Sequence, residues 1–154
     1  MYLLPVLLLM VIFPVISVGI EHFFFHGTIP LMSLVGKWFV FWGAGVRLVL
    51  AGIRQFFQPR FTAQQIFGLT GDEPLPIVRE LGVANFATGT VGVLSLLKPG
   101  FVLPVSIAAA VFYGVAGIRH ATDKHKNQKQ QFAMITDLLA FVVFVAYIVF
   151  AMSR

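Results

Sequence analysis

Long apolar runs, each bounded by a short polar connection, dominate the pattern of this chain. A helix of about 20 residues, rising 1.5 Å per residue, crosses the ~30 Å hydrocarbon layer of a bilayer. The runs that reach about this length are residues 2–20, 33–57, 77–97, 101–119 and 132–152. We therefore predict an all-α integral membrane protein, a five-helix bundle that forms one domain over residues 1–154.

The connection at residues 58–77 interrupts the apolar pattern for longer than any other. Pro59, Gly71 and Pro74 mark it as turn-rich. Thr62 is a suitable cap for a short helix reaching Gly68, and the apolar side chains of such a helix would dip into the membrane interface. We predict a short interfacial helix between the second and third spans.

Composition supports a membrane environment over a soluble one. Hydrophobic residues make up 58 % of the chain and charged residues 11 %, whereas soluble domains carry roughly 25 % charged residues. The net charge of +5 comes from basic residues in the connections, so it indicates topology and a lipid bilayer as partner, not nucleic acid. The absence of cysteine excludes disulfides, thiolate metal sites and cysteine nucleophiles.

The distribution of Lys and Arg predicts an orientation. No basic residue precedes Lys37 and no cleavage site is evident, so we expect the first segment to be retained as a helix. With five spans, one face of the membrane holds Arg54, Arg60, Arg79, Arg119, Lys124, Lys126 and Lys129, and the other holds Lys37, Lys98 and Arg154. The positive-inside rule then predicts a multi-pass protein of the cell inner membrane with a cytoplasmic N-terminus and an outside C-terminus.

Antiparallel threading predicts that scattered polar residues meet in the cytoplasmic half of the bilayer. They come from four different helices and are Arg47, Arg54, Glu80, Asn85, His120 and Asp137. Ionisable residues inside a membrane face a partner or a wet cavity. We expect Glu80, Asn85, His120 and Asp137 to form a site, with Arg54 or Arg47 as the counter-charge.

Three uses of this cluster remain open. It is a site for a small molecule, a lipid headgroup or a proton, because intramembrane ionisable residues mark such sites. Alternatively it only locks the helices of a structural or accessory subunit together, because a paired buried charge is far better than an unpaired one. The third reading is a membrane enzyme that uses His120 as acid and base with a carboxylate partner.

Other chemistry finds little support in the residues. Glu21, His22 and His26 suggest a metal cluster, since two histidines four residues apart share a helix face. The general-base Glu of the zinc-enzyme helix motif is missing, and we expect no metal. Phosphate-loop, dinucleotide and nucleophile-elbow motifs are absent from the sequence, and we predict no cofactor.

Small residues recur where helices would pack. Gly43, Gly45 and Gly52 lie in the second predicted span, and residues 78–92 carry a further series of Gly, Ala and Thr. Small residues let helix backbones approach closely in a membrane. From these faces and the small size of the chain we also predict a homo-oligomer.

Several strings resemble a known family. IVRELGVANFATGTVGVLSL, YGVAGIRHA and AMITDLLAF, preceded by FTAQQIFGL, are similar to a family of small bacterial and archaeal integral membrane proteins of unknown function. The pattern is carried here by Glu80, Gly82, Ala84, Asn85, Gly89, Gly117, His120 and Asp137. The resemblance spans roughly residues 43–150 and implies the helical membrane fold and the polar cluster, without implying a reaction.

Overall fold

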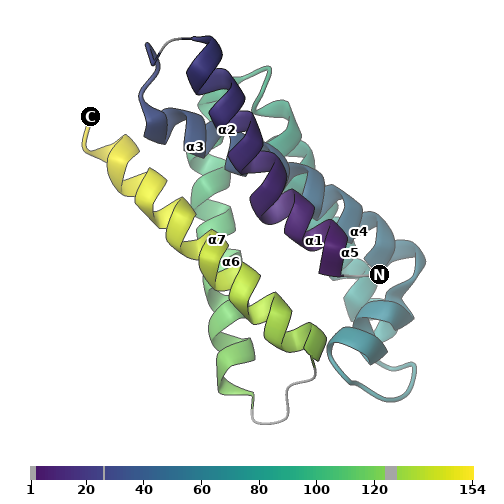
Figure 1. Cartoon of the computed structure of the whole chain (residues 1–154). Coiled ribbons are helices and arrows are strands. Elements are labelled where there is room, and N and C mark those ends of the chain that lie inside the picture. The colour runs from purple at the N-terminus through teal and green to yellow at the C-terminus, as the bar shows by residue number, and fades with distance from the viewer. Residues whose placement is uncertain (1–2, 26, 124–127) are drawn as a thin grey trace.

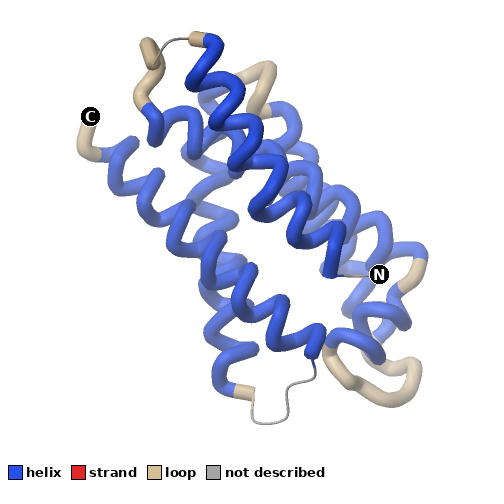
Figure 2. The backbone as a smooth tube through the Cα atoms, viewed as in Figure 1, coloured by secondary structure: helices blue, strands red, loops and turns tan. Residues whose placement is uncertain are grey.

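The computed structural model describes residues 3–25, 27–123 and 128–154, and every regular element within these ranges is a helix (Figure 2). The all-α prediction is therefore confirmed. Two long helices come first in the chain. Their consecutive segments are α1 (Leu3–Leu7), η1 (Leu8–Ile12) and α2 (Phe13–Phe24), then α3 (Leu31–Phe39), η2 (Val40–Val46) and α4 (Arg47–Phe57). The remaining helices are η3 (Phe61–Ile66), α5 (Leu75–Leu94), η4 (Pro99–Phe101), α6 (Val102–Thr122) and α7 (Gln128–Met152).

Four stretches within the described ranges are long and apolar enough to cross a membrane. They are Leu3–Phe24, Leu31–Phe57, Pro99–Thr122 and Gln128–Met152. The predicted third span exists as α5, a helix of 20 residues, but it is not one of these four. Arg79 and Glu80 lie in its first half and Asn85 at its middle, and they make it less apolar than its neighbours.

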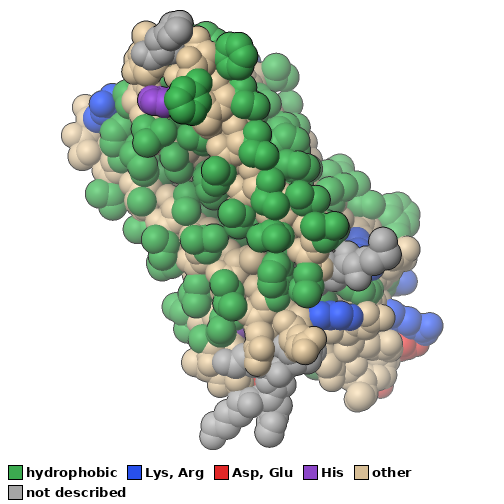
Figure 3. All heavy atoms as spheres, in the orientation of Figure 1, with side chains coloured by type: hydrophobic (Ala, Val, Ile, Leu, Met, Phe, Trp, Pro, Cys, Tyr) green, Lys and Arg blue, Asp and Glu red, His purple; other side chains and the backbone are tan. Residues whose placement is uncertain are grey.

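The sides of the bundle are apolar. Phe23, Val111 and Val149 are examples of large hydrophobic side chains that are more than half exposed. In the view of Figure 3, hydrophobic side chains cover the middle of the molecule, and Lys, Arg, Asp and Glu appear only toward its ends. Such a surface suits contact with lipid, where a soluble protein would need polar side chains.

The helices alternate in direction, so the connections gather at two ends. Figure 1 shows the beginning of α1, the helix η3 and the adjoining ends of α6 and α7 at the lower end of the bundle. The turn from α2 to α3, the turn from α5 to α6 and the C-terminus lie at the upper end. We call the lower one the η3 end.

The connection between α4 and α5 contains the short helix expected there, with one difference. Thr62 does not cap it: the helix begins at Phe61, and Thr62 is a buried residue inside it. Gly68 and Gly71 follow with positive φ angles of 67° and 81°, which glycine adopts without the steric cost of a side chain. Positive φ at both glycines turns the chain back toward α5.

Glycines set the contact between α4 and α5. A Cβ built at Gly52 would lie 2.5 Å from the carbonyl oxygen of Gly82, and one at Gly89 would lie 2.5 Å from the amide nitrogen of Val49. Gly45 and Gly92 also meet backbone to backbone. The predicted close approach of these helices is therefore confirmed for Gly45 and Gly52. A Cβ built at Gly43 would have its nearest neighbours 3.9 Å or more away, so a close helix contact does not require glycine at this position.

The second long helix widens just before Arg47. The amide of Arg47 donates to the carbonyl of Trp42, five residues back, where an α-helix would use the residue four back. The carbonyl of Gly43 in this wide turn accepts a 2.6 Å hydrogen bond from the hydroxyl of the fully buried Tyr113 on α6. Because a wide turn shifts the facing of every later residue, it decides where Arg47 points.

Candidate functional site: a cavity at the η3 end

A cavity of about 550 Å³ lies among the helices near the η3 end. Its walls come from α1 and η1, α4, η3, α5, α6 and α7, so segments far apart in sequence close it together. Five of the six residues predicted to meet line this cavity. They are Arg47, Arg54, Asn85, His120 and Asp137. Antiparallel threading therefore brings these five residues to one cavity, with Arg47 and Arg54 about 10 Å apart along α4.

An ion pair crosses the cavity. A guanidinium nitrogen of Arg47 on α4 lies 3.0 Å from a carboxylate oxygen of Asp137 on α7. The two side chains are 13 % and 7 % exposed, respectively. The guanidinium also lies over the ring of Tyr113, 4.8 Å from its centroid. Each charge is thus compensated away from water, which is the condition for burying such groups.

Asn85 is held by a residue outside the predicted set. The Asn85 side chain on α5 is 5 % exposed and donates a 2.8 Å hydrogen bond to the amide oxygen of Gln55 on α4. Gln55 also lines the cavity. Ala51 follows Arg47 by four residues, and Arg54 and Gln55 follow Ala51 by three and four, so one face of α4 supplies them all. This spacing was the sequence signal for Gln55.

In the wall beside η3, the side chains of Arg54 and His120 lie against aromatic rings. The guanidinium of Arg54 stacks on Phe61, 3.5 Å from its centroid. The imidazole of His120 lies nearly parallel to the ring of Phe67, with centroids 6.5 Å apart. Both aromatic rings belong to the connection after α4, so η3 and the residue following it close this side of the site.

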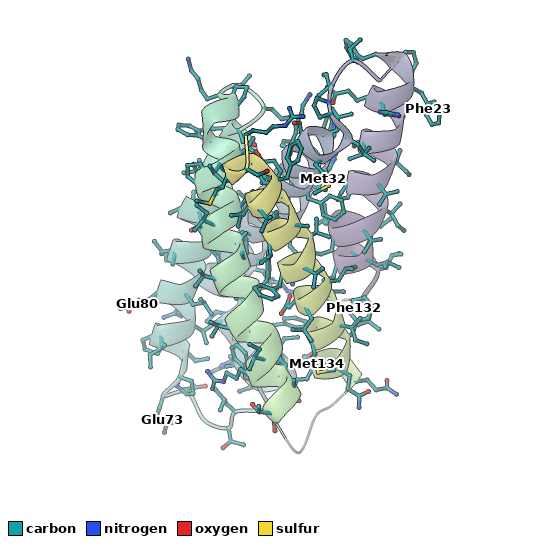
Figure 4. All side chains as sticks on the ribbon, turned by 90° about the vertical axis from the view of Figure 1, so that its left-hand side faces the viewer. Phe23, Met32, Glu73, Glu80, Phe132 and Met134 are labelled. Atoms are coloured by element: carbon teal, nitrogen blue, oxygen red, sulfur yellow. The ribbon has the colours of Figure 1, made fainter. Side chains whose placement is uncertain are left out.

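Glu80 does not join the cluster. Its side chain is exposed and does not line the cavity, and Figure 4 shows it pointing away from the bundle. Glu80 and Asn85 are five positions apart on α5, which places their side chains about 140° apart around the helix axis. With Asn85 facing α4, Glu80 must face outward. The expectation that the carboxylates of Glu80 and Asp137 share a site therefore needs correcting.

Two further groups line the cavity without having been predicted as site residues. Arg119 precedes His120 on α6, and both also line a second cavity of about 330 Å³ next to the first. Pro5, Val6 and Leu9 bring the first helix into the wall. Adjacency to His120 was the signal for Arg119. The residues of the first helix carry no polar chemistry, and only the packing identifies them.

Glu21 and His22, two of the residues considered for metal binding, lie in α2 at the end of the bundle opposite η3. Glu21 accepts hydrogen bonds of 2.7 and 2.8 Å from Lys37 and one of 2.6 Å from the indole of Trp38. His22 has a buried ring nitrogen, Nδ1, with no hydrogen-bond partner among the residues that the structure describes. His26 lies outside the described residues, so the predicted spacing of two histidines has no geometry to test it. The carboxylate of Glu21 is committed to a lysine and a tryptophan.

One more ion pair lies at the η3 end, outside the cavity. Asp72 accepts hydrogen bonds of 3.2 and 2.7 Å from Arg60, and both side chains are exposed. This hydrogen bonding raises the pKa of Arg60 above its ordinary value. Arg60 is therefore a paired surface arginine, in contrast to the arginines of the cavity wall.

These features define a class: a helical bundle with helices long and apolar enough to cross a membrane and, at one end, a mainly apolar cavity that a few polar side chains enter. Within that class, the chain belongs to the DUF6790 family, a family of unknown function whose sequence model matches residues 2–154. The match extends beyond the stretch of roughly residues 43–150 that carried the resemblance, and it includes the first helix. No curated protein and no solved structure matches the chain.

Proposed function

We propose that this protein is a five-span membrane protein that binds a small amphipathic molecule from the bilayer in the cavity at the η3 end. In this proposal the membrane is the cell inner membrane and the N-terminus is cytoplasmic. The helix α5 is the fifth span, and its polar residues are the reason that it is not among the four apolar helices. The four apolar helices and the alternating direction of the chain support the arrangement. The buried Asn85 of α5 bonds Gln55 of α4, and Arg79 and Glu80 lie in the second turn of α5, where charged side chains near the end of a span reach the membrane interface.

The observation that carries the proposal is the composition of the cavity. Apolar side chains make up most of its wall, and a few polar groups converge within it, among them Arg47, Asn85 and Asp137. Binding sites for small molecules have this character, with volumes of roughly 300–1,000 Å³. A volume of about 550 Å³ suits a single small ligand.

A neutral fluorescent probe tests the proposal directly. Purified protein in a neutral detergent is titrated with N-phenyl-1-naphthylamine, whose emission rises in apolar surroundings. We expect saturable binding by the parent chain. Ala116→Trp, which fills the cavity, should abolish it, because Ala116 lines the wall. Val83→Trp is the control, since Val83 is exposed on α5 outside the cavity. Equal binding by all three proteins would contradict the proposal.

The ion pair of Arg47 and Asp137 favours a second candidate, the structural lock. In that reading the same residues only hold α4 and α7 together in an accessory subunit. Asn85→Ala separates the two. Loss of stability with unchanged probe binding supports the lock, and normal stability with altered binding supports the site.

Two further expectations stay predictions. Catalysis that uses His120 as acid and base would be lost in His120→Gln. Homo-oligomer formation would show in the native mass in detergent. The glycines of α4 and α5, which suggested an oligomer, pack against one another inside the chain, so they no longer argue for it.

A further inference from the structure

The charge of the cavity wall is unbalanced. Among the lining residues that the structure describes, three are arginines and one, Asp137, is a carboxylate. Asp137 pairs with Arg47, so Arg54 and Arg119 remain uncompensated. Neither of these two forms an ion pair within the described part of the chain. A wall with two uncompensated guanidiniums attracts an anion and repels a cation.

The geometry of Arg54 prepares it to bind an anionic group. Its guanidinium stacks on Phe61 at 3.5 Å, and stacking uses the face of the group. The N–H donors of a guanidinium lie in its plane and form a fork that matches carboxylate and phosphate oxygens. Lys129 on α7 lies 5.5 Å from the centroid of the same ring and donates a hydrogen bond to Gln65 of η3, so a second cation lies near this ring.

An apolar track leads away from these arginines. Leu50, Val111 and Val115 line the cavity and are 52 %, 63 % and 63 % exposed, so they stand at its mouth. Val115 and Val111 precede Arg119 on α6 by four and eight residues, which are about 6 and 12 Å along the helix axis. The track therefore runs from the arginines toward the middle of the bundle.

We propose that the cavity binds a single-chain amphiphile with an anionic headgroup, a carboxylate or a phosphate. This rests on the proposed function. The headgroup bonds Arg54 and Arg119 at the η3 end, and the chain lies along α4 and α6 toward the mouth. This is also the orientation of a lipid in the leaflet that borders the η3 end. A cavity of about 550 Å³ has room for one chain with its headgroup.

The test is competition against the neutral probe N-phenyl-1-naphthylamine. The competitors share a 14-carbon chain: a fatty acid, a monoacylglycerol phosphate and an uncharged monoacylglycerol. We expect the two anionic compounds to displace the probe at concentrations at least about tenfold lower than the neutral compound requires. This is the gain expected from hydrogen bonds to a charged group. Inorganic phosphate alone should displace far more weakly than the monoacylglycerol phosphate.

Variants assign the preference to residues. Arg54→Gln with Arg119→Gln should remove the tenfold preference while the probe still binds. Arg60→Gln is the matched control, because Arg60 is exposed at the same end, outside the cavity. Arg54→Lys with Arg119→Lys keeps both charges and should keep a preference. Each variant is first checked for an unchanged unfolding temperature, and the single Arg119→Gln replaces the pair if the pair unfolds early.

The outcomes separate this proposal from the broader one. Equal displacement by neutral and anionic compounds overturns the anionic headgroup and leaves the proposed function standing. Failure of the parent chain to bind the probe removes both. Displacement by inorganic phosphate as strong as that by its acylated form overturns the role of the chain. A folded Gln variant that retains the preference overturns the assignment to these two arginines.

Discussion

At the scale of residues, the carboxylates of Asp137 and Glu80 lie in opposite environments within one helical bundle. Asp137 is buried and pairs with Arg47 across the cavity. Glu80 is exposed on the outer side of α5. Both positions looked alike in sequence, since each lies near the beginning of a predicted span. Only the rotation of each helix about its axis distinguishes a site residue from a surface residue.

The ion pair predicts strong coupling between its members. Arg47→Met leaves the Asp137 carboxylate buried without its partner, and we expect it to lower the free energy of unfolding by about 3 kcal/mol. Asp137→Leu alone leaves the Arg47 guanidinium buried without its partner and should also lower the free energy of unfolding. The double variant should regain most of the loss, because two apolar side chains need no charge compensation. Denaturant unfolding in detergent, followed by circular dichroism, measures the cycle.

Arg60→Met is the control for this cycle. Its partner Asp72 is exposed, so water replaces the lost ion pair and unfolding should not change. Additive losses in the double variant, without recovery, would show that Arg47 and Asp137 do not depend on one another.

At the scale of elements, the contact of α4 with α5 depends on the absence of side chains. The glycines at 45 and 52 are seven residues apart, as are those at 82 and 89, so each pair lies on one helix face. This contact places Asn85 against Gln55 and carries α5 past the cavity. The polar residues that make α5 less apolar than the other long helices therefore lie on different sides of it, Asn85 toward α4 and Glu80 toward the outside.

Adding one methyl group at this contact should separate the helices. In Gly52→Ala and Gly89→Ala the new Cβ would meet backbone atoms at 2.5 Å, and backbone cannot give way as a flexible side chain does. We expect each variant to lose about 1–3 kcal/mol of stability, the usual cost of overpacking. The unfolding temperature in detergent is the measurement.

Gly19→Ala is the matched control, because no atom lies within 4 Å of a Cβ built there. Alanine favours a helix over glycine by up to about 1 kcal/mol, so this variant should be neutral or slightly more stable. A Gly52→Ala protein as stable as Gly19→Ala would mean that α4 and α5 do not pack through these glycines.

At the scale of the whole molecule, the threading predicts which connections share a side of the membrane. The chain contains no cysteine, so single cysteines report topology without background. We expect Asp72→Cys to react with a membrane-impermeant maleimide only after the cells are opened. Ser153→Cys and Lys98→Cys should react in intact cells, because the C-terminus and the turn from α5 to α6 lie at the end of the bundle opposite the η3–α5 connection, which holds Asp72. All three positions are exposed in the structure.

The pattern of labelling also tests the role of α5. If α5 does not cross the membrane, Asp72→Cys and Lys98→Cys will react under the same conditions. Labelling of Asp72→Cys alone in intact cells would preserve the five spans and invert the orientation.

The sequence by itself determined the class of protein and the depth of its polar residues. Run length and polarity are local properties, and a residue count along a helix converts directly into height within the bundle. For this reason five of the six predicted site residues line one cavity. The breaks in the pattern also located the connections, including the short helix before α5.

Only the tertiary structure decided which way the side chains face. The wide turn before Arg47 shifts the facing of α4, and it forms where Tyr113, 70 residues away, binds the carbonyl of Gly43. Contact with α4 turns Asn85 inward and Glu80 outward, and packing brings the apolar first helix into the cavity wall. Facing depends on partners distant in sequence, and no local pattern carries that information.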